Sequence, residues 1–145
     1  MKLLSEIKNI IIETSKILDK PLTDKDFYIL HQPLKHKPKR LPDNSMAVYT
    51  FVYKGEFLKI GQANYKSKAR YQSHHYNPGS AISTLAGSLL NDDSMKGLLN
   101  RETVTQWIRD NCERFDVIID KKHGKKTLNF IEGLLHYKYD PKYEG

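Results

Sequence analysis

The sequence has little that would cross-link the chain or anchor it in a membrane. Its single cysteine, Cys112, excludes a disulfide within the chain and fits a reducing compartment, so we expect a cytoplasmic protein. No apolar run approaches the roughly 20 residues that a membrane span needs. Glu6 and Glu13 interrupt the N-terminal apolar residues and no small-residue cleavage site follows, so this segment is expected to belong to the mature protein.

Acidic residues are also scarce relative to basic ones, 17 against 24, which gives a formal net charge of +7. A basic chain of 145 residues favours polyanionic partners, nucleic acid before an anionic membrane surface. Residues 35–40 and residues 121–126 each carry four basic side chains. Either run alone is equally consistent with a solvated surface loop.

The composition, 39% hydrophobic and 28% charged, is that of a globular domain. Apolar residues recur at helical spacing over residues 2–19, Pro21 ends this helix, and Thr23 is a candidate cap for a second short helix. Residues 31–45 contain three prolines and read as an extended basic linker. We therefore predict a helical extension with a linker at residues 1–45 and the main domain at residues 46–145.

The main domain is predicted to have an α+β fold. Residues 46–53 are β-branched and aromatic, residues 54–56 suit a turn, and residues 57–61 continue the pattern, which together predict a β-hairpin. The elements expected after it are helices around Arg70, after Ser80 and over residues 100–112, a strand over 115–120 and a helix over 126–138. This order predicts a small mixed or antiparallel sheet, the hairpin plus one further strand, flanked by helices.

Two groups of residues have the chemistry of an active site. Glu132 and His136 are i, i+4 neighbours on one face of the last predicted helix, beside its apolar stripe, although spacing alone favours an ordinary surface pair. Tyr49, Lys59 and Arg70 lie on the two hairpin strands and the following helix. Cations neutralise phosphate charge and a phenol can transfer a proton, but tyrosine and lysine are also common strand residues, so spacing leaves both interpretations open.

The order of these motifs resembles the GIY-YIG nuclease superfamily over residues 46–145. "AVYTF", "LKIG", "ARYQSHH" and "IEGLLH" follow one another at similar spacing. "AVY" stands where that family has GIY, "KIG" stands where it has YIG, and Arg70 and Glu132 match its arginine and its metal-binding glutamate. The resemblance is closer to the branch with a KIG second motif, which includes restriction endonucleases and phage-type domains and tends to have a histidine where His136 stands. The late asparagine of many members is not evident in "YDPKYEG".

The resemblance implies a metal-dependent DNA endonuclease that acts in restriction, phage defence or a mobile element. Tyr49 would be the general base, its phenol pKa lowered by Lys59 and Arg70. Lys59 would hold a phosphate or help the attacking water, and Arg70 would stabilise charge on phosphorus. Glu132 would bind one Mg²⁺ or Mn²⁺. His136 would contact the scissile phosphate, protonate the leaving group or orient Glu132.

The expected partner is DNA, with RNA a further candidate, and cutting both strands with one site per chain favours a homodimer. No membrane or small-molecule cofactor is expected. Two alternatives stand beside the nuclease: an inactive nucleic-acid-binding module on the same fold, favoured by the missing asparagine, and an interaction subunit whose basic runs only keep it soluble. The residues expected to contact nucleic acid are Lys35, Lys37, Lys39, Arg40, Lys66, Lys68, His74 and His75, although the two histidines would equally suit packing against the next loop.

Overall fold

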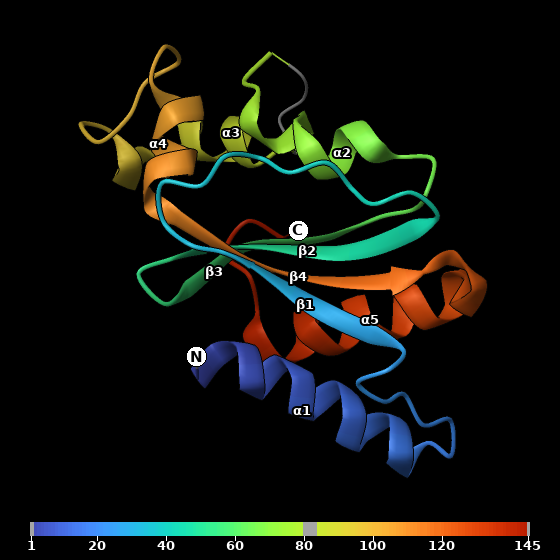
Figure 1. Cartoon of the computed structure of the whole chain (residues 1–145). Coiled ribbons are helices and arrows are strands. Elements are labelled where there is room, and N and C mark those ends of the chain that lie inside the picture. Colours follow the sequence, from blue (N-terminus) through green and yellow to red (C-terminus); the bar gives the residue numbers. More distant parts are fainter. Residues whose placement is uncertain (1, 80–83, 145) are drawn as a thin grey trace.

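The computed structural model describes residues 2–79 and 84–144. In these residues one four-stranded antiparallel sheet lies between two layers of helices (Figure 1). This confirms the predicted α+β class. The strands follow the order β1-β4-β2-β3 across the sheet, so that β1 and β3 form its edges. Their bounds are β1 Phe27–Gln32, β2 Ser45–Tyr53, β3 Glu56–Ala63 and β4 Cys112–Asp120.

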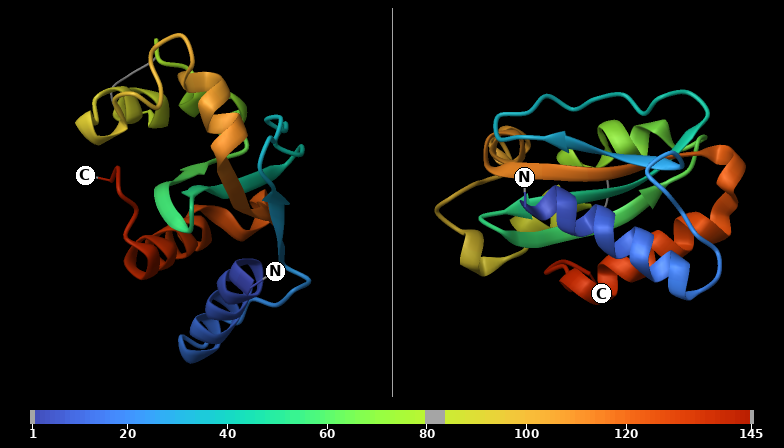
Figure 2. Two further views of the ribbon diagram at one scale, coloured as in Figure 1. Left: turned by 90° about the vertical axis from the view of Figure 1, so that its left-hand side faces the viewer. Right: turned by 60° about the horizontal axis from the view of Figure 1, so that its bottom comes forward.

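The helices divide between the two faces of the sheet (Figures 1 and 2). Helices α1 (Lys2–Ile17) and α5 (Gly124–Tyr139) cover one face. Helices α2 (Lys68–Gln72), α3 (Leu85–Leu90) and α4 (Val104–Asn111) cover the other, together with the short 3₁₀ turns η1 (His74–Tyr76) and η2 (Asp93–Met95). A third 3₁₀ turn, η3 (Lys121–His123), leads from β4 into α5. No helix of the described residues is long and apolar enough to cross a membrane.

Strands β2 and β3 form the predicted hairpin. Its turn is made by Lys54 and Gly55, whose φ angles of 49° and 81° are both positive, as a two-residue type I′ turn requires. In the paired strands Tyr49 lies opposite Gly61 and Phe51 lies opposite Lys59. Directly opposed residues point to the same face of a sheet, so these four positions all face the layer that contains α2.

The prediction of a short helix after Thr23 is wrong. The Asp26 carboxylate accepts a hydrogen bond from the Thr23 N–H at 2.8 Å and closes a turn, and β1 follows at once. Strand β1 pairs with β4 from Phe27↔Ile119 to Gln32↔Arg114, so its partner lies far along the chain. Ser80, predicted to cap a helix, lies outside the described residues. The side chain that caps α3 is Thr84, whose Oγ1 accepts from the Gly87 N–H at 3.1 Å.

The segment that precedes the predicted boundary near Ser45 contributes to the same sheet and cores. Residues 33–44, called the strap below, run across the α2–α4 layer in the upper part of Figure 1. The His36 N–H donates to the Arg109 carbonyl at 3.1 Å, and Leu41 is fully buried in the core beneath this layer. Helix α1 contributes Ile7 and Ile11 to the core on the opposite face.

The two faces of the sheet bury different residues. The face covered by α1 and α5, called the aliphatic face below, packs isoleucine, valine, leucine and a few phenylalanine side chains. The face covered by α2, α3 and α4, called the aromatic face, packs Tyr49, Phe51, Tyr71 and Tyr76. The β2–β4 pairing is interrupted on either side of Thr50, between the pairs Val48↔Val117 and Val52↔Glu113. There the Asp116 carboxylate accepts the Thr50 N–H at 3.1 Å in place of a backbone carbonyl.

Candidate functional site

A cavity of about 170 Å³ opens beside edge strand β3. Its walls come from β2, β3, α2, η1, α5 and the residues that follow α5. The side chains and backbone that line it belong to Tyr49, Lys59, Ile60, Gly61, Gln62, Arg70, His74, His75, Glu132 and Glu144. Four of the five predicted catalytic residues therefore meet in one cavity, and the fifth, His136, lies one helical turn from Glu132.

The position of the Tyr49 ring requires a glycine at position 61. A Cβ atom at Gly61 would lie 2.6 Å from Cζ of Tyr49, closer than carbon atoms approach without bonding. The Tyr49 ring therefore crosses the backbone of β3 at Gly61 and brings its hydroxyl to the cavity. Any larger residue at position 61 would displace the ring.

The hydrogen bonds of His75 fix its protonated nitrogen. A backbone N–H can only donate, and the Leu85 N–H points at His75 Nδ1 at 3.0 Å, so Nδ1 is the acceptor. The neutral ring then carries its proton on Nε2 and donates it to the Tyr49 hydroxyl oxygen, 2.6 Å away. Burial, followed by the charge of nearby Lys59, lowers the pKa of His75 to about 3, so this ring stays neutral near pH 7.

The prediction that Tyr49 has a lowered pKa is wrong. Burial is the largest effect and raises the pKa of the phenol well above its usual value, although the charge of Arg70 acts in the opposite direction. The His75 ring cannot relieve this by taking the phenol proton, because Nε2 already carries one. Tyr49 is therefore a protonated hydroxyl whose acceptor side is occupied by His75, and its own proton is available to a group in the cavity.

Lys59 is held by the residues that follow α5. Its Nζ lies 3.3 Å from Glu144 Oε1 and donates to the Tyr143 carbonyl at 3.4 Å. The backbone N–H groups of Lys142 and Tyr143 donate to the carbonyls of Phe57 and Leu58, so this tail pairs with the open edge of β3. Sequence reasoning missed Glu144, since nothing in "YDPKYEG" indicates that these residues return to β3.

Glu132 reaches the cavity from α5 and is held by a hydrogen bond from β3. Its Oε1 accepts from Gln62 Nε2 at 2.7 Å, and the same amide nitrogen donates to Asn129 Oδ1 at 2.8 Å. Its Oε2 lies 3.8 Å from His136 Nε2, which makes a 3.0 Å hydrogen bond to the Ile60 carbonyl. A carbonyl can only accept, so Nε2 carries the proton. His136 is thus anchored to β3 beside Glu132 and makes no hydrogen bond to its carboxylate.

The oxygen donors of the cavity fit a hard divalent cation that keeps most of its water. Glu132 and Glu144 both line it. Mg²⁺ is commonly bound by one or two carboxylates together with water and substrate oxygens, and Mn²⁺ accepts similar ligands. In the part of the chain that the structure describes, no group of three or more histidine, cysteine, aspartate or glutamate side chains is placed to hold an ion. The residues therefore suit an ion completed by substrate rather than an all-protein cage.

Of the residues predicted to contact nucleic acid, only His74 and His75 line this cavity. Arg40 at the end of the strap and Lys68 on α2 both approach Asp43, at 3.7 and 2.7 Å, which places the strap beside α2. Lys35, Lys37 and Lys39 are exposed along the strap, and Lys66 is exposed after β3. His74 is half-buried in the cavity wall, and His75 is buried, so its contacts are those to Tyr49 and Leu85.

A buried ion pair supports the segment that carries Arg70 and His75. Arg114 and Asp116 are both fully buried, with 3.1 Å between Nη2 and Oδ2. The Arg114 guanidinium donates to the Tyr71 carbonyl at 3.2 Å and to the Tyr76 hydroxyl at 3.0 Å. Tyr71 also donates its hydroxyl proton to Asp116 at 2.8 Å. Tyr71 follows Arg70 and Tyr76 follows His75, so both ends of this segment are tied to β4.

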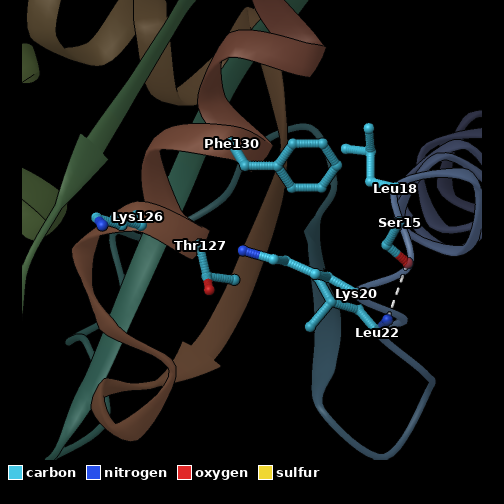
Figure 3. A pocket seen from close by; sticks show the side chains of 7 residues that line it. All are labelled: Ser15, Leu18, Lys20, Leu22, Lys126, Thr127 and Phe130. Atoms are coloured by element: carbon cyan, nitrogen blue, oxygen red, sulfur yellow. Dashed lines mark hydrogen bonds between the residues drawn. The ribbon is translucent and has the colours of Figure 1, made fainter.

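A second cavity, of about 210 Å³, lies between the end of α1 and the start of α5 (Figure 3). Apolar groups of Leu18, Leu22 and Phe130 form much of its wall, and Lys20 points across it. Ser15 Oγ accepts the Leu22 N–H at 2.8 Å and ties the chain after α1 to this helix. None of the predicted catalytic residues lines it.

Comparison with protein-family models, with curated proteins and with solved structures gave no match to the chain. The resemblance to the GIY-YIG superfamily therefore rests on the residues and their order in this sequence.

Proposed function

We propose that the protein is a metal-dependent endonuclease that hydrolyses phosphodiester bonds in DNA. The observation that supports this most is that Tyr49, Lys59, Arg70 and Glu132, brought together from four different elements, line one cavity. A phenol, two cations and a metal-binding carboxylate are groups that can promote phosphodiester hydrolysis. The net charge of +7 suits a polyanionic substrate.

Arg70 and Lys59 supply the positive charge. In the proposed reaction the phosphodiester enters between them, because both line the cavity. Negative charge builds on the phosphate oxygens as water attacks, and fixed cations stabilise it without reorganisation. The Arg70 guanidinium can hold two oxygens at once, whereas the Lys59 ammonium acts as a point charge that the Glu144 carboxylate and the Tyr143 carbonyl keep in place.

Tyr49 has a positioning and proton-donating role in this proposal. Its hydroxyl oxygen accepts from His75, so its own proton would be donated to a non-bridging phosphate oxygen, while the attacking water would release its proton to solvent. The rigid ring over Gly61 fixes the direction of that bond. This role replaces that of a general base with a lowered pKa.

Glu132 would hold the divalent cation, with its carboxylate oriented by the hydrogen bond from Gln62. When bound, Mg²⁺ or Mn²⁺ supplies Lewis-acid polarisation of a phosphoryl oxygen and lowers the pKa of coordinated water.

The proposal extends to location and assembly. The buried single cysteine, Cys112, fits action in the cytoplasm. Cleavage of both strands of a duplex would use two copies of the chain.

The proposal is tested by incubating the wild type, Glu132→Gln and Lys59→Met with supercoiled plasmid, single-stranded DNA and RNA, in Mg²⁺, Mn²⁺ or EDTA. Glu102→Gln, on an exposed loop outside the cavity, is the matched control. We expect cutting by the wild type and the control only when metal is present, and at least a hundredfold loss in the two cavity variants. Cutting in EDTA, or wild-type rates from Glu132→Gln, would contradict the mechanism.

A nucleic-acid-binding module without catalysis is the second candidate. The observation that favours it is the Glu144 carboxylate beside Lys59, which occupies the neighbourhood where a phosphate would bind. Salt-dependent binding by the wild type, with no cutting of any substrate in either metal, would select this alternative.

A further inference from the structure

An exposed tyrosine lies among lysines at the end of β3. Tyr65 is 39% exposed, and the Nζ atoms of Lys66 and Lys121 lie 5.7 and 4.9 Å from its ring centroid. The Asn64 side chain accepts from the Lys66 N–H at 2.8 Å and from Ser67 Oγ at 3.1 Å, which closes the turn that presents Tyr65. The turn therefore fixes the backbone at Tyr65, and two lysine ammonium groups lie over its partly exposed ring.

The lysines of this surface have no acidic partner among the described residues, in contrast to some other lysines. Lys59, Lys96 and Lys142 each lie within 4.0 Å of a carboxylate. Over residues 2–79 and 84–144, no carboxylate lies within that distance of Lys66, Lys121 or Lys125. All three lysines are exposed, so their positive charge is free to attract an anion.

Strand β3 and helix α5 both lead from the candidate cavity towards this surface. Gln62, which lines the cavity, bonds to Asn129 of α5, and Tyr65 follows Gln62 by three residues. Lys125 precedes Asn129 by one turn of α5. The end of β3 and the start of α5 lie at the same end of the sheet, on the right in Figure 1. A strand that places one phosphate in the cavity can therefore continue over Tyr65.

We propose that Tyr65, Lys66, Lys121 and Lys125 form a subsite for a nucleotide that flanks the scissile phosphate. The Tyr65 ring stacks on an unpaired base, and the lysines contact the adjoining phosphates. Stacking of a base on an aromatic ring is sequence-tolerant, and a basic groove that follows the backbone accompanies it in proteins that bind single strands. The inference rests on the proposed nuclease function and narrows its substrate to nucleic acid that is single-stranded or splayed beside the cut.

The test measures binding in the Glu132→Gln background, so that no cutting occurs. Fluorescence anisotropy gives Kd for single-stranded and duplex oligonucleotides of the same sequence, and a 2-aminopurine base reports stacking. The variants are Tyr65→Ala, Tyr65→Phe and Lys121→Gln. The matched control is Tyr137→Ala, because Tyr137 is 93% exposed on α5 and does not line the cavity.

We expect Tyr65→Ala to weaken single-strand binding about tenfold and to abolish 2-aminopurine quenching, because one stacked base is lost. Tyr65→Phe and Tyr137→Ala should bind like the parent. Lys121→Gln should reduce the slope of log K against log salt by about 1. Equal affinities of Tyr65→Ala and its parent, or an equal loss for duplex and single strand, would overturn the subsite while leaving the nuclease intact. If the wild type neither binds nor cuts nucleic acid, the proposed function fails as well.

Discussion

The aliphatic and aromatic faces of the sheet are built on different principles. The aliphatic face buries side chains such as Ile7, Ile11 and Leu135, which pack by shape and transfer from water and need no particular partner. The aromatic face buries Arg114 and Asp116, and both side chains form hydrogen bonds with tyrosine hydroxyl groups. A buried polar group that must be satisfied dictates the orientation of its neighbours. The aromatic face is therefore the one suited to hold catalytic side chains in fixed positions.

The buried ion pair that orients these side chains contributes little to the stability of the fold. A buried ion pair usually contributes no more to the free energy of folding than well-packed apolar residues of similar volume. Arg114 and Asp116 nevertheless lie beneath the α2–η1 segment, which carries Arg70 and His75. We infer that this pair fixes the candidate site, while the aliphatic face supplies stability.

The largest effect is expected from Asp116→Ala. The substitution leaves the Arg114 guanidinium buried without its carboxylate, and the Thr50 N–H and the Tyr71 hydroxyl lose their acceptor. We expect a loss of about 3–5 kcal/mol in the free energy of unfolding, measured by urea denaturation. Cleavage should fall as well, because α2 and η1 lose an attachment to β4.

The double variant Arg114→Met with Asp116→Leu provides the control for this prediction. It removes both charges, so it should be more stable than Asp116→Ala by about 1 kcal/mol or more. Cleavage should stay low, because the double variant also loses the hydrogen bonds of Arg114 to the Tyr71 carbonyl and to the Tyr76 hydroxyl. A double variant that regains both stability and cleavage would show that the site does not depend on the polar core.

The second effect is a loss of stability in acid. Burial, with the charge of Arg114 as the next cause, lowers the pKa of His36 from 6.5 to about 4. As the pH falls, His36 is therefore protonated at a higher pH in the unfolded chain than in the folded one. The contribution of the neutral His36 to the free energy of unfolding is complete above pH 6.5 and is lost as the pH falls towards 4. At about 1.4 kcal/mol per pKa unit, the loss reaches about 3 kcal/mol. Urea midpoints between pH 7.5 and pH 4 measure it.

His36→Gln is the matched variant, since a glutamine at this position does not titrate. Its stability should depend less steeply on pH than that of the wild type over this range. His75, whose pKa is lowered to about 3, remains in both proteins and leaves a residual slope. Identical slopes in the two proteins would mean that His36 is not the titrating group.

The third effect comes from Gly61→Ala. The added methyl group would meet the Tyr49 ring, which must move away from β3. Insertion of one carbon into a packed site costs about 1–3 kcal/mol. Cleavage should fall by more than this loss of stability explains, because the Tyr49 hydroxyl leaves its contact with His75. The matched control is Gly133→Ala on α5, where a Cβ meets nothing within 4 Å. Wild-type cleavage by Gly61→Ala would contradict the geometry proposed for Tyr49.

Local patterns in the sequence were sufficient for the hairpin and for the helices that begin and end the chain. The order of Tyr49, Lys59, Arg70 and Glu132 placed them on the elements where the structure has them, since turn chemistry and apolar periodicity are local properties. Strand β1 was missed because its residues become a strand only by pairing with β4, whose sequence is distant.

Three features of the candidate site depend on tertiary packing and have no local signature. Glu144 enters the cavity because β3 is an edge strand whose open carbonyls accept the tail. Gln62 is fixed by its contacts with Asn129 and Glu132, which the hairpin alone does not indicate. The pKa of Tyr49 was predicted in the wrong direction because its nearby cations were counted and its burial was not.

The smallest effect is expected from Ile11→Val on the aliphatic face. Ile11 is fully buried between α1 and the sheet, and removal of one methyl group costs about 0.5–1.5 kcal/mol. The residue makes no polar contact that the site uses, so cleavage per folded molecule should equal that of the wild type. Urea denaturation and an initial-rate assay measure the two quantities on the same sample. If the cleavage rate fell together with stability in this variant, the two faces would be coupled. The dependence of the site on its core would then not be specific to the buried Arg114–Asp116 pair.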